Sequence, residues 1–125
     1  MLVHTPVSVG ELADKITILQ IKKERITDPA KLRNIQYEFD VLQSVWNERG
    51  LREQVNMADL YYVNETLWDI EDKIRIKESK QEFDGEFISL ARAVYKTNDK
   101  RAQLKKQINE QVGSTLVEEK SYAHT

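Results

Sequence analysis

Four stretches of the sequence carry apolar residues at helical spacing, and this pattern constrains the fold more than any other feature. The apolar residues step by three and four positions, which places them on one side of an α-helix. The predicted helices span about 8–26, 29–49, 57–80 and 85–112. Because the links between them are short, neighbouring helices should run antiparallel. We therefore expect an all-α, antiparallel four-helix bundle that forms a single domain over residues 1–125.

Side chains at the expected helix starts support these boundaries. Ser8 and Glu11 have the spacing of a capping box, in which each side chain binds a backbone N–H of the other residue. Asp28 and Asp84 are suitable N-caps for the second and fourth helices. The predicted core stripes consist of Leu12, Ile16, Leu19 and Ile26; Leu32, Ile35, Phe39, Leu42 and Trp46; Leu60, Val63, Leu67, Ile70 and Ile74; and Phe87, Leu90, Ala91, Val94, Ile108 and Val112.

The composition excludes several classes of site. Cysteine is absent, and the two histidines, His4 and His124, lie near opposite ends of the chain. Disulfides, thiolate catalysis and Cys-ligated metals are excluded, and we expect no metal site and no cofactor. A net charge of −2 argues against a general nucleic-acid binder. No apolar run could cross a membrane and no signal-peptide pattern opens the chain, so we expect a cytoplasmic protein without membrane contact.

Three polar residues interrupt the apolar stripe of the fourth helix. Asn98, Arg101 and Lys105 fall on the line of Val94 and Ile108. Buried amides and cations need partners, so these side chains are candidates for binding a phosphate or carboxylate of a ligand. Alternatively, the two cations reach out to solvent while the amide binds a neighbouring backbone, or the helix breaks at Thr97.

Two further groups could complete such a site. Asp14 shares a side of the first helix with buried isoleucines, so it could pair with Arg101 or Lys105, or it could be a solvated acid that favours the helix dipole. On the third helix, a second group flanks the apolar stripe and could line a ligand groove or a protein interface. Its ordinary alternative is a boundary tryptophan beside an i,i+4 ion pair. This group consists of Asn64, Trp68, Glu71 and Arg75.

Basic residues gather between 92 and 106. Arg92, Lys96 and Lys100 fall on the outer side of the fourth helix. Since the chain lacks any nucleic-acid reader motif, a solvated surface is the favoured interpretation. Motifs for phosphate loops, serine hydrolases and zinc proteases are also missing, so catalytic residues stay unassigned.

Several long blocks of the sequence carry a family resemblance: VSVGELADKITILQIKKERI, LWDIEDKIRIKE, FISLARAVYKTNDKRAQLKKQIN and GSTLVEEKSY. They resemble a family of small uncharacterised proteins, a domain of unknown function from bacteria and their viruses. The resemblance extends from about Pro6 to Tyr122. It implies an association with surface-sugar and glycosyltransferase genes, but no activity.

These observations leave two functional hypotheses. The first is a non-enzymatic helical interaction or accessory module. The second is a small helical enzyme or sensor in which Arg75, Arg101 and Lys105 bind an anionic metabolite, as cationic side chains do in chorismate-type mutases.

We also expect a homodimer anchored by Trp46 and Trp68, because the first and fourth helices are apolar on more than one side. The tail over residues 114–125 could be an extended strap anchored by Leu116, Val117 and Tyr122, or it could fray.

Overall fold

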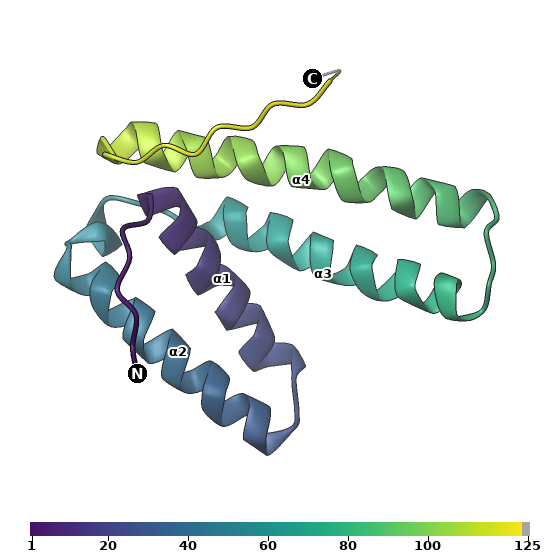
Figure 1. Ribbon diagram of the computed structural model, residues 1–125, viewed down its shortest axis with the longest axis horizontal. Helices are drawn as coiled ribbons and strands as arrows, with labels where there is room; N and C mark the ends of the chain where they lie inside the picture. Colours follow the sequence, from purple (N-terminus) through teal and green to yellow (C-terminus); the bar gives the residue numbers. More distant parts are fainter. Residues whose placement is uncertain (124–125) are drawn as a thin grey trace.

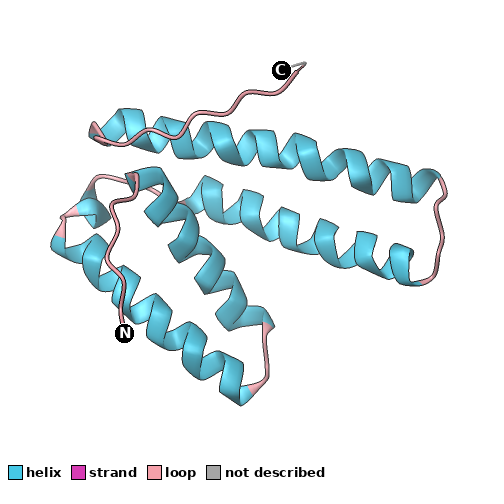
Figure 2. Cartoon of the chain, in the orientation of Figure 1, coloured by secondary structure: helices cyan, strands magenta, loops and turns pink. Residues whose placement is uncertain are grey.

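The computed structural model describes residues 1–123 and contains four long helices and no strand in that range (Figures 1 and 2). The helices are α1 (Val9–Arg25), α2 (Pro29–Glu48), α3 (Ala58–Ser79) and α4 (Gly85–Val112), with a short 3₁₀ helix η1 (Leu51–Glu53) between α2 and α3. The predicted all-α bundle with an extended C-terminal strap is confirmed. Within the described residues, no helix is long and apolar enough to span a membrane.

Helix α1 is the centre of the bundle. It packs against α2, α3 and α4, whereas α2 contacts only α1 and η1 among the described elements. Helices α3 and α4 form an antiparallel hairpin, and α1 and α2 form a second one beside it (Figure 1). Residues that α1 presents to α3 and α4 are therefore enclosed on several sides.

The core lies around the N-terminal half of α1. Its buried members are Leu12, Ala13, Ile16, Trp46, Leu51, Val55, Leu60 and Ile108. Trp46 is 1% exposed. The expectation that Trp46 anchors a dimer is therefore wrong, because the apolar stripe of α2 faces α1 and places this indole in the core.

The first turn of α1 lies directly against the backbone of α4. A Cβ atom on Gly10 would lie 2.3 Å from the carbonyl oxygen of Lys105, closer than non-bonded atoms can approach. The Gly10 N–H donates to Asn109 Oδ1 at 2.6 Å, and both residues are buried. Only glycine permits this approach, which brings the next turn of α1 under the side chains of α4.

The starts of the helices are capped largely as predicted. The Ser8 hydroxyl accepts from the Glu11 N–H at 3.1 Å, and Asp28 and Asp84 cap α2 and α4 in the same way. The capping box is not completed, since the Glu11 carboxylate turns to Lys105 instead.

The C-terminal tail reverses direction at Gly113, whose φ of 66° is left-handed, and runs back along α4 (Figure 1). The Ser114 hydroxyl accepts from the Val9 N–H at 3.1 Å. Apolar burial does not hold the predicted anchors of this strap, because Leu116, Val117 and Tyr122 are all exposed. Ion pairs of the two glutamates at 118 and 119 with lysines of α4 hold the tail instead. His124 and Thr125 lie outside the described residues.

The far half of the α3–α4 hairpin has little cover. No residue between 68 and 104 is fully buried, although α3 and α4 continue to pack against each other there. We call this part the distal hairpin.

Candidate functional site

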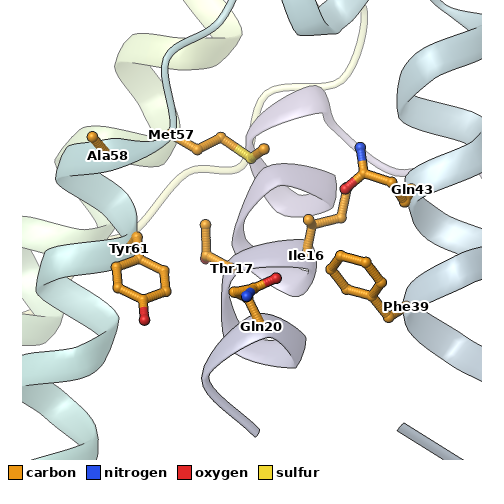
Figure 3. A pocket seen from close by; sticks show the side chains of 8 residues that line it. All are labelled: Ile16, Thr17, Gln20, Phe39, Gln43, Met57, Ala58 and Tyr61. Atoms are coloured by element: carbon orange, nitrogen blue, oxygen red, sulfur yellow. The ribbon is translucent and has the colours of Figure 1, made fainter. Parts of the chain in front are cut away.

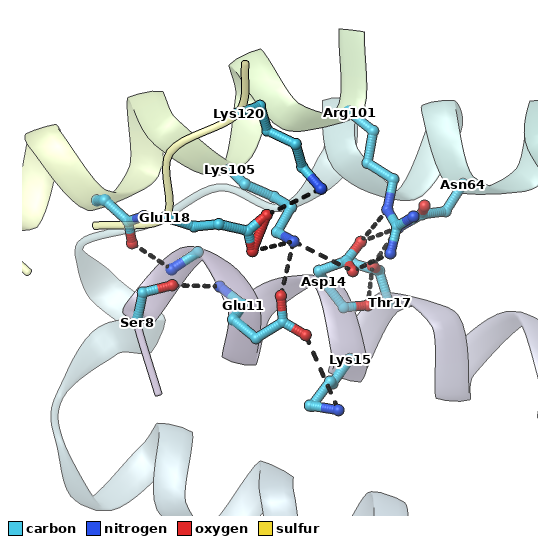
Figure 4. Close-up of polar contacts among 12 residues, drawn as sticks. Ser8, Glu11, Asp14, Lys15, Thr17, Asn64, Arg101, Lys105, Glu118 and Lys120 are labelled. Carbon is cyan, nitrogen blue, oxygen red and sulfur yellow. Dashed lines mark hydrogen bonds and ion pairs between the residues drawn. The ribbon is translucent and has the colours of Figure 1, made fainter. Parts of the chain in front are cut away.

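Two of the three polar residues expected on the fourth helix, Arg101 and Lys105, meet α1 in an ion-pair cluster (Figure 4). Asp14 lies at its centre and is 1% exposed. The Arg101 guanidinium donates to both oxygens of this carboxylate, with Nε 2.8 Å from Oδ1. The Asn64 amide donates to Asp14 Oδ1 and to the Thr17 hydroxyl, each at 2.9 Å. Asp14 thus links helices α1, α3 and α4.

Lys105 forms the second half of the cluster. Its ammonium lies 2.6 Å from Glu11 Oε2, 3.4 Å from Glu118 Oε2 and 3.9 Å from Asp14 Oδ2. Burial alone would lower the pKa of Lys105, but the hydrogen bond with Glu11 and the nearby carboxylates outweigh it, and the pKa is raised. The tail therefore contributes a carboxylate to a site formed mainly by α1 and α4.

The pKa values of Arg101 and Glu118 are also shifted by their partners in the cluster. The hydrogen bonds to Asp14 raise the pKa of Arg101 in spite of partial burial. Burial acts to raise the pKa of Glu118, but the hydrogen bond from Lys120 and the charge of Lys105 hold it below its usual value. Within the described residues, no buried side-chain nitrogen or oxygen lacks a hydrogen-bond partner. The cluster is internally compensated and leaves no unpaired cation for a ligand.

Asn98 does not join the cluster. The expectation that it faces inward is wrong, because its side chain is exposed. Helix α4 is continuous through Thr97, so a helix break is not the cause. Instead α1 leaves α4 beyond Asp14 and crosses towards α3, where Arg25 pairs with Asp69 at 2.9 Å.

The polar group expected on α3 is divided. Asn64 belongs to the ion-pair cluster, whereas Glu71 and Arg75 form an exposed i,i+4 pair at 3.2 Å, which matches the ordinary alternative. Trp68 is half-buried at the start of the distal hairpin. Glu11 and Glu118, the acids beside Lys105, are not predictable from the sequence. The spacing of Glu11 from Ser8 indicates a capping box instead, and Glu118 lies in the tail beyond the predicted helices.

A small cavity of about 260 Å³ lies between α1, α2 and α3, lined by Ile16, Thr17, Gln20, Phe39, Gln43, Met57, Ala58 and Tyr61 (Figure 3). It is smaller than the pockets of about 300 Å³ and above that usually hold ligands. The hydrogen bond that Tyr61 donates to Glu24 raises the pKa of this tyrosine to about 12. This tyrosine is therefore held protonated and is a poor general base.

A second stripe runs along the outer side of α4 through the distal hairpin. Its residues repeat at spacings of three and four: Ile88, Ala91, Tyr95, Asn98 and Ala102. Ala91, predicted for the core stripe, and Ala102 are half-buried at the edge of this set, whereas the other three residues are exposed. Ile88 and Tyr95 are 57% and 53% exposed. We call this set the outer stripe. Its spacing is that of the contact positions in a helix that pairs with another helix.

The fold and the cluster define an all-helical bundle in which internal ion pairs join the first helix to the last. The chain belongs to the family of unknown function DUF6165, whose family model matches residues 3–125. No curated protein and no solved structure matches the chain at a significant level.

Proposed function

We propose that this protein is a non-enzymatic interaction module that pairs with a second copy of itself through the outer stripe of α4. The observation that carries the proposal is the exposed Ile88 and Tyr95 of this stripe together with the charges beside it. Arg92 and Asp99 flank the stripe on one side, both are exposed, and neither has an ion-pair partner among the described residues.

A two-fold axis between Tyr95 and Asn98 explains this placement. If two α4 helices pack antiparallel about that axis, Arg92 of each copy meets Asp99 of the other, so two ion pairs form. In the same arrangement Ala91 lies opposite Ala102 of the other copy, which lets the two backbones approach closely. Tyr95 then lies opposite Asn98, a polar residue of the kind that fixes the register of paired helices. Self-complementarity of this sort is what a two-fold interface requires.

The ion-pair cluster supports a non-enzymatic role. Arg101 and Lys105 already bind carboxylates of the same chain, and Arg75 lies elsewhere on α3 beside Glu71. An enzyme of the mutase type would need these three cations around one ligand. A link to phages or surface sugars is suggested by the sequence resemblance alone, and the pairing does not depend on it.

Light scattering after size-exclusion chromatography tests the pairing. We expect a mass near twice the 14.6 kDa of one chain at micromolar concentration. Tyr95→Glu should give a monomer, because it puts a charge in the centre of the stripe. Tyr37→Glu is the matched control, since Tyr37 is 61% exposed on α2. A wild-type mass of one chain would refute the proposal.

Charge exchange tests the orientation. Arg92→Glu and Asp99→Arg should each weaken the dimer, because each places like charges opposite one another. The double variant restores both pairs and should recover the dimer. A dimer that is insensitive to both single variants would show that a different surface is used.

A further inference from the structure

A groove between α3 and α4 forms a second cavity, apart from the ion-pair cluster and the outer stripe. Its cavity volume is about 630 Å³, within the range of small-molecule sites. The lining includes Asp59, Tyr62 and Thr66 from α3 and Lys96, Lys100 and Gln103 from α4. None of these residues belongs to the ion-pair cluster or to the outer stripe, so the groove is independent of the proposed dimer.

The wall formed by α4 holds two cations without a counter-charge. Lys96 and Lys100 are four positions apart, and both are exposed. Within the described residues neither has a carboxylate in ion-pair distance, whereas Lys77, Lys105 and Lys106 all do. Like charges at this spacing repel, and a bound anion would remove the repulsion. Lysine ammonium groups bind phosphate as point charges.

The wall formed by α3 offers different chemistry. Tyr62 is 68% exposed, so most of its ring is accessible to a ligand. Because α3 and α4 are antiparallel, Asp59 lies towards the Gln107 end of the groove and Thr66 towards the Lys96 end. Asp59 has no ion-pair partner among the described residues, so its carboxylate can accept hydrogen bonds from hydroxyl groups.

We propose that this groove binds a small phosphate monoester that carries a hydroxyl-bearing ring. The phosphate lies between Lys96 and Lys100, the ring lies against Tyr62, and its hydroxyl groups donate towards Asp59. The acid at one end disfavours a long polyanion, which would carry phosphates along the whole groove. Sugar phosphates and nucleoside monophosphates share this chemistry.

Amide chemical shifts of the full chain test the proposal, with ribose 5-phosphate, ribose, inorganic phosphate and adenosine monophosphate as probes. We expect ribose 5-phosphate to shift the amides of Thr66, Lys96 and Gln103. Ribose should cause no shift, and inorganic phosphate should bind at least about tenfold more weakly, because it lacks the ring contacts. Tighter binding of adenosine monophosphate would assign the groove to nucleotides, and weaker binding would assign it to sugar phosphates.

Two double variants separate this site from general charge attraction. Lys96→Met with Lys100→Met should weaken ribose 5-phosphate binding by about tenfold or more, since both phosphate contacts are lost. Lys31→Met with Lys80→Met is the control, because it removes the same charge from exposed lysines outside the groove. Equal losses in both pairs, no shifts in the groove, or equal affinity for inorganic phosphate would overturn the proposal. Since all four lysines are exposed, matched melting temperatures should show that the variants remain folded.

Discussion

Replacing Arg101 by alanine tests whether the ion-pair cluster stabilises the fold. Asp14 is 1% exposed, so the substitution leaves a buried carboxylate that keeps the Asn64 amide and a distant Lys105 ammonium, 3.9 Å away. Removing one partner of a buried pair costs roughly 3 to 5 kcal/mol. Because the Arg101 side chain is 29% exposed, water can reach the vacated space, and we expect a loss of about 3 kcal/mol.

Urea unfolding followed by tryptophan fluorescence, to which the fully buried Trp46 and the half-buried Trp68 both contribute, measures this loss. Arg75→Ala is the matched control, since its ion pair is exposed and should be worth less than about 1 kcal/mol. The double variant Asp14→Leu with Arg101→Met removes both charges and should recover much of the lost stability. A loss below about 1 kcal/mol for Arg101→Ala, or a double variant less stable than the single one, would refute the argument that the loss comes from an unpaired buried charge.

Three further predictions concern single sites. Gly10→Ala should destabilise the fold by about 1 to 3 kcal/mol in urea unfolding, because its Cβ would meet a backbone carbonyl at 2.3 Å. Gly85→Ala has open space and should be neutral or slightly stabilising, so an equal loss in both variants would contradict the close approach. The lowered pKa of Glu118 stabilises the fold above its unfolded value of about 4.3, and this contribution is lost as pH falls through the folded value. Between about pH 6 and about pH 3, the melting temperature of Glu118→Gln should therefore fall less than that of the unaltered protein. The pKa of Tyr61 can be measured from the difference between the ultraviolet titration curves of the unaltered protein and Tyr61→Phe. The midpoint of this difference should lie near pH 12, and a midpoint near pH 10 would contradict the hydrogen bond to Glu24.

The helices were predictable because their signals are local. Stripes at helical spacing and the caps at Ser8, Asp28 and Asp84 involve residues within a few positions of each other. The pairing of Asp14 with Arg101 was one of the predicted alternatives, since helical phase turned both towards the interior. The helical phase of a residue does not show where two helices diverge. Because α1 leaves α4 beyond Asp14, no helix covers Asn98, and its side chain is exposed.

Other features depend on tertiary geometry that no local pattern encodes. Gly10 could have been read only as an ordinary helix residue, yet it sets the distance between α1 and α4. The role of Glu11 was obscured because one glutamate can satisfy either a capping box or a distant lysine. The groove beside Lys96 and Lys100 was interpreted from the sequence as a solvated surface, because a second wall on α3 cannot be seen in one helix.

The contact between Asp14 and Arg101 joins residues 87 positions apart in the chain. A ribosome makes proteins from the N-terminus, so α1 emerges long before the guanidinium that neutralises its buried carboxylate. Until α4 has left the exit tunnel, α1 and α2 can form a hairpin but cannot enclose Asp14 without the cost of an unpaired charge. Asp14 therefore stays open to solvent until synthesis has passed residue 101, and the nascent chain depends on its last helix to enclose a residue of its first.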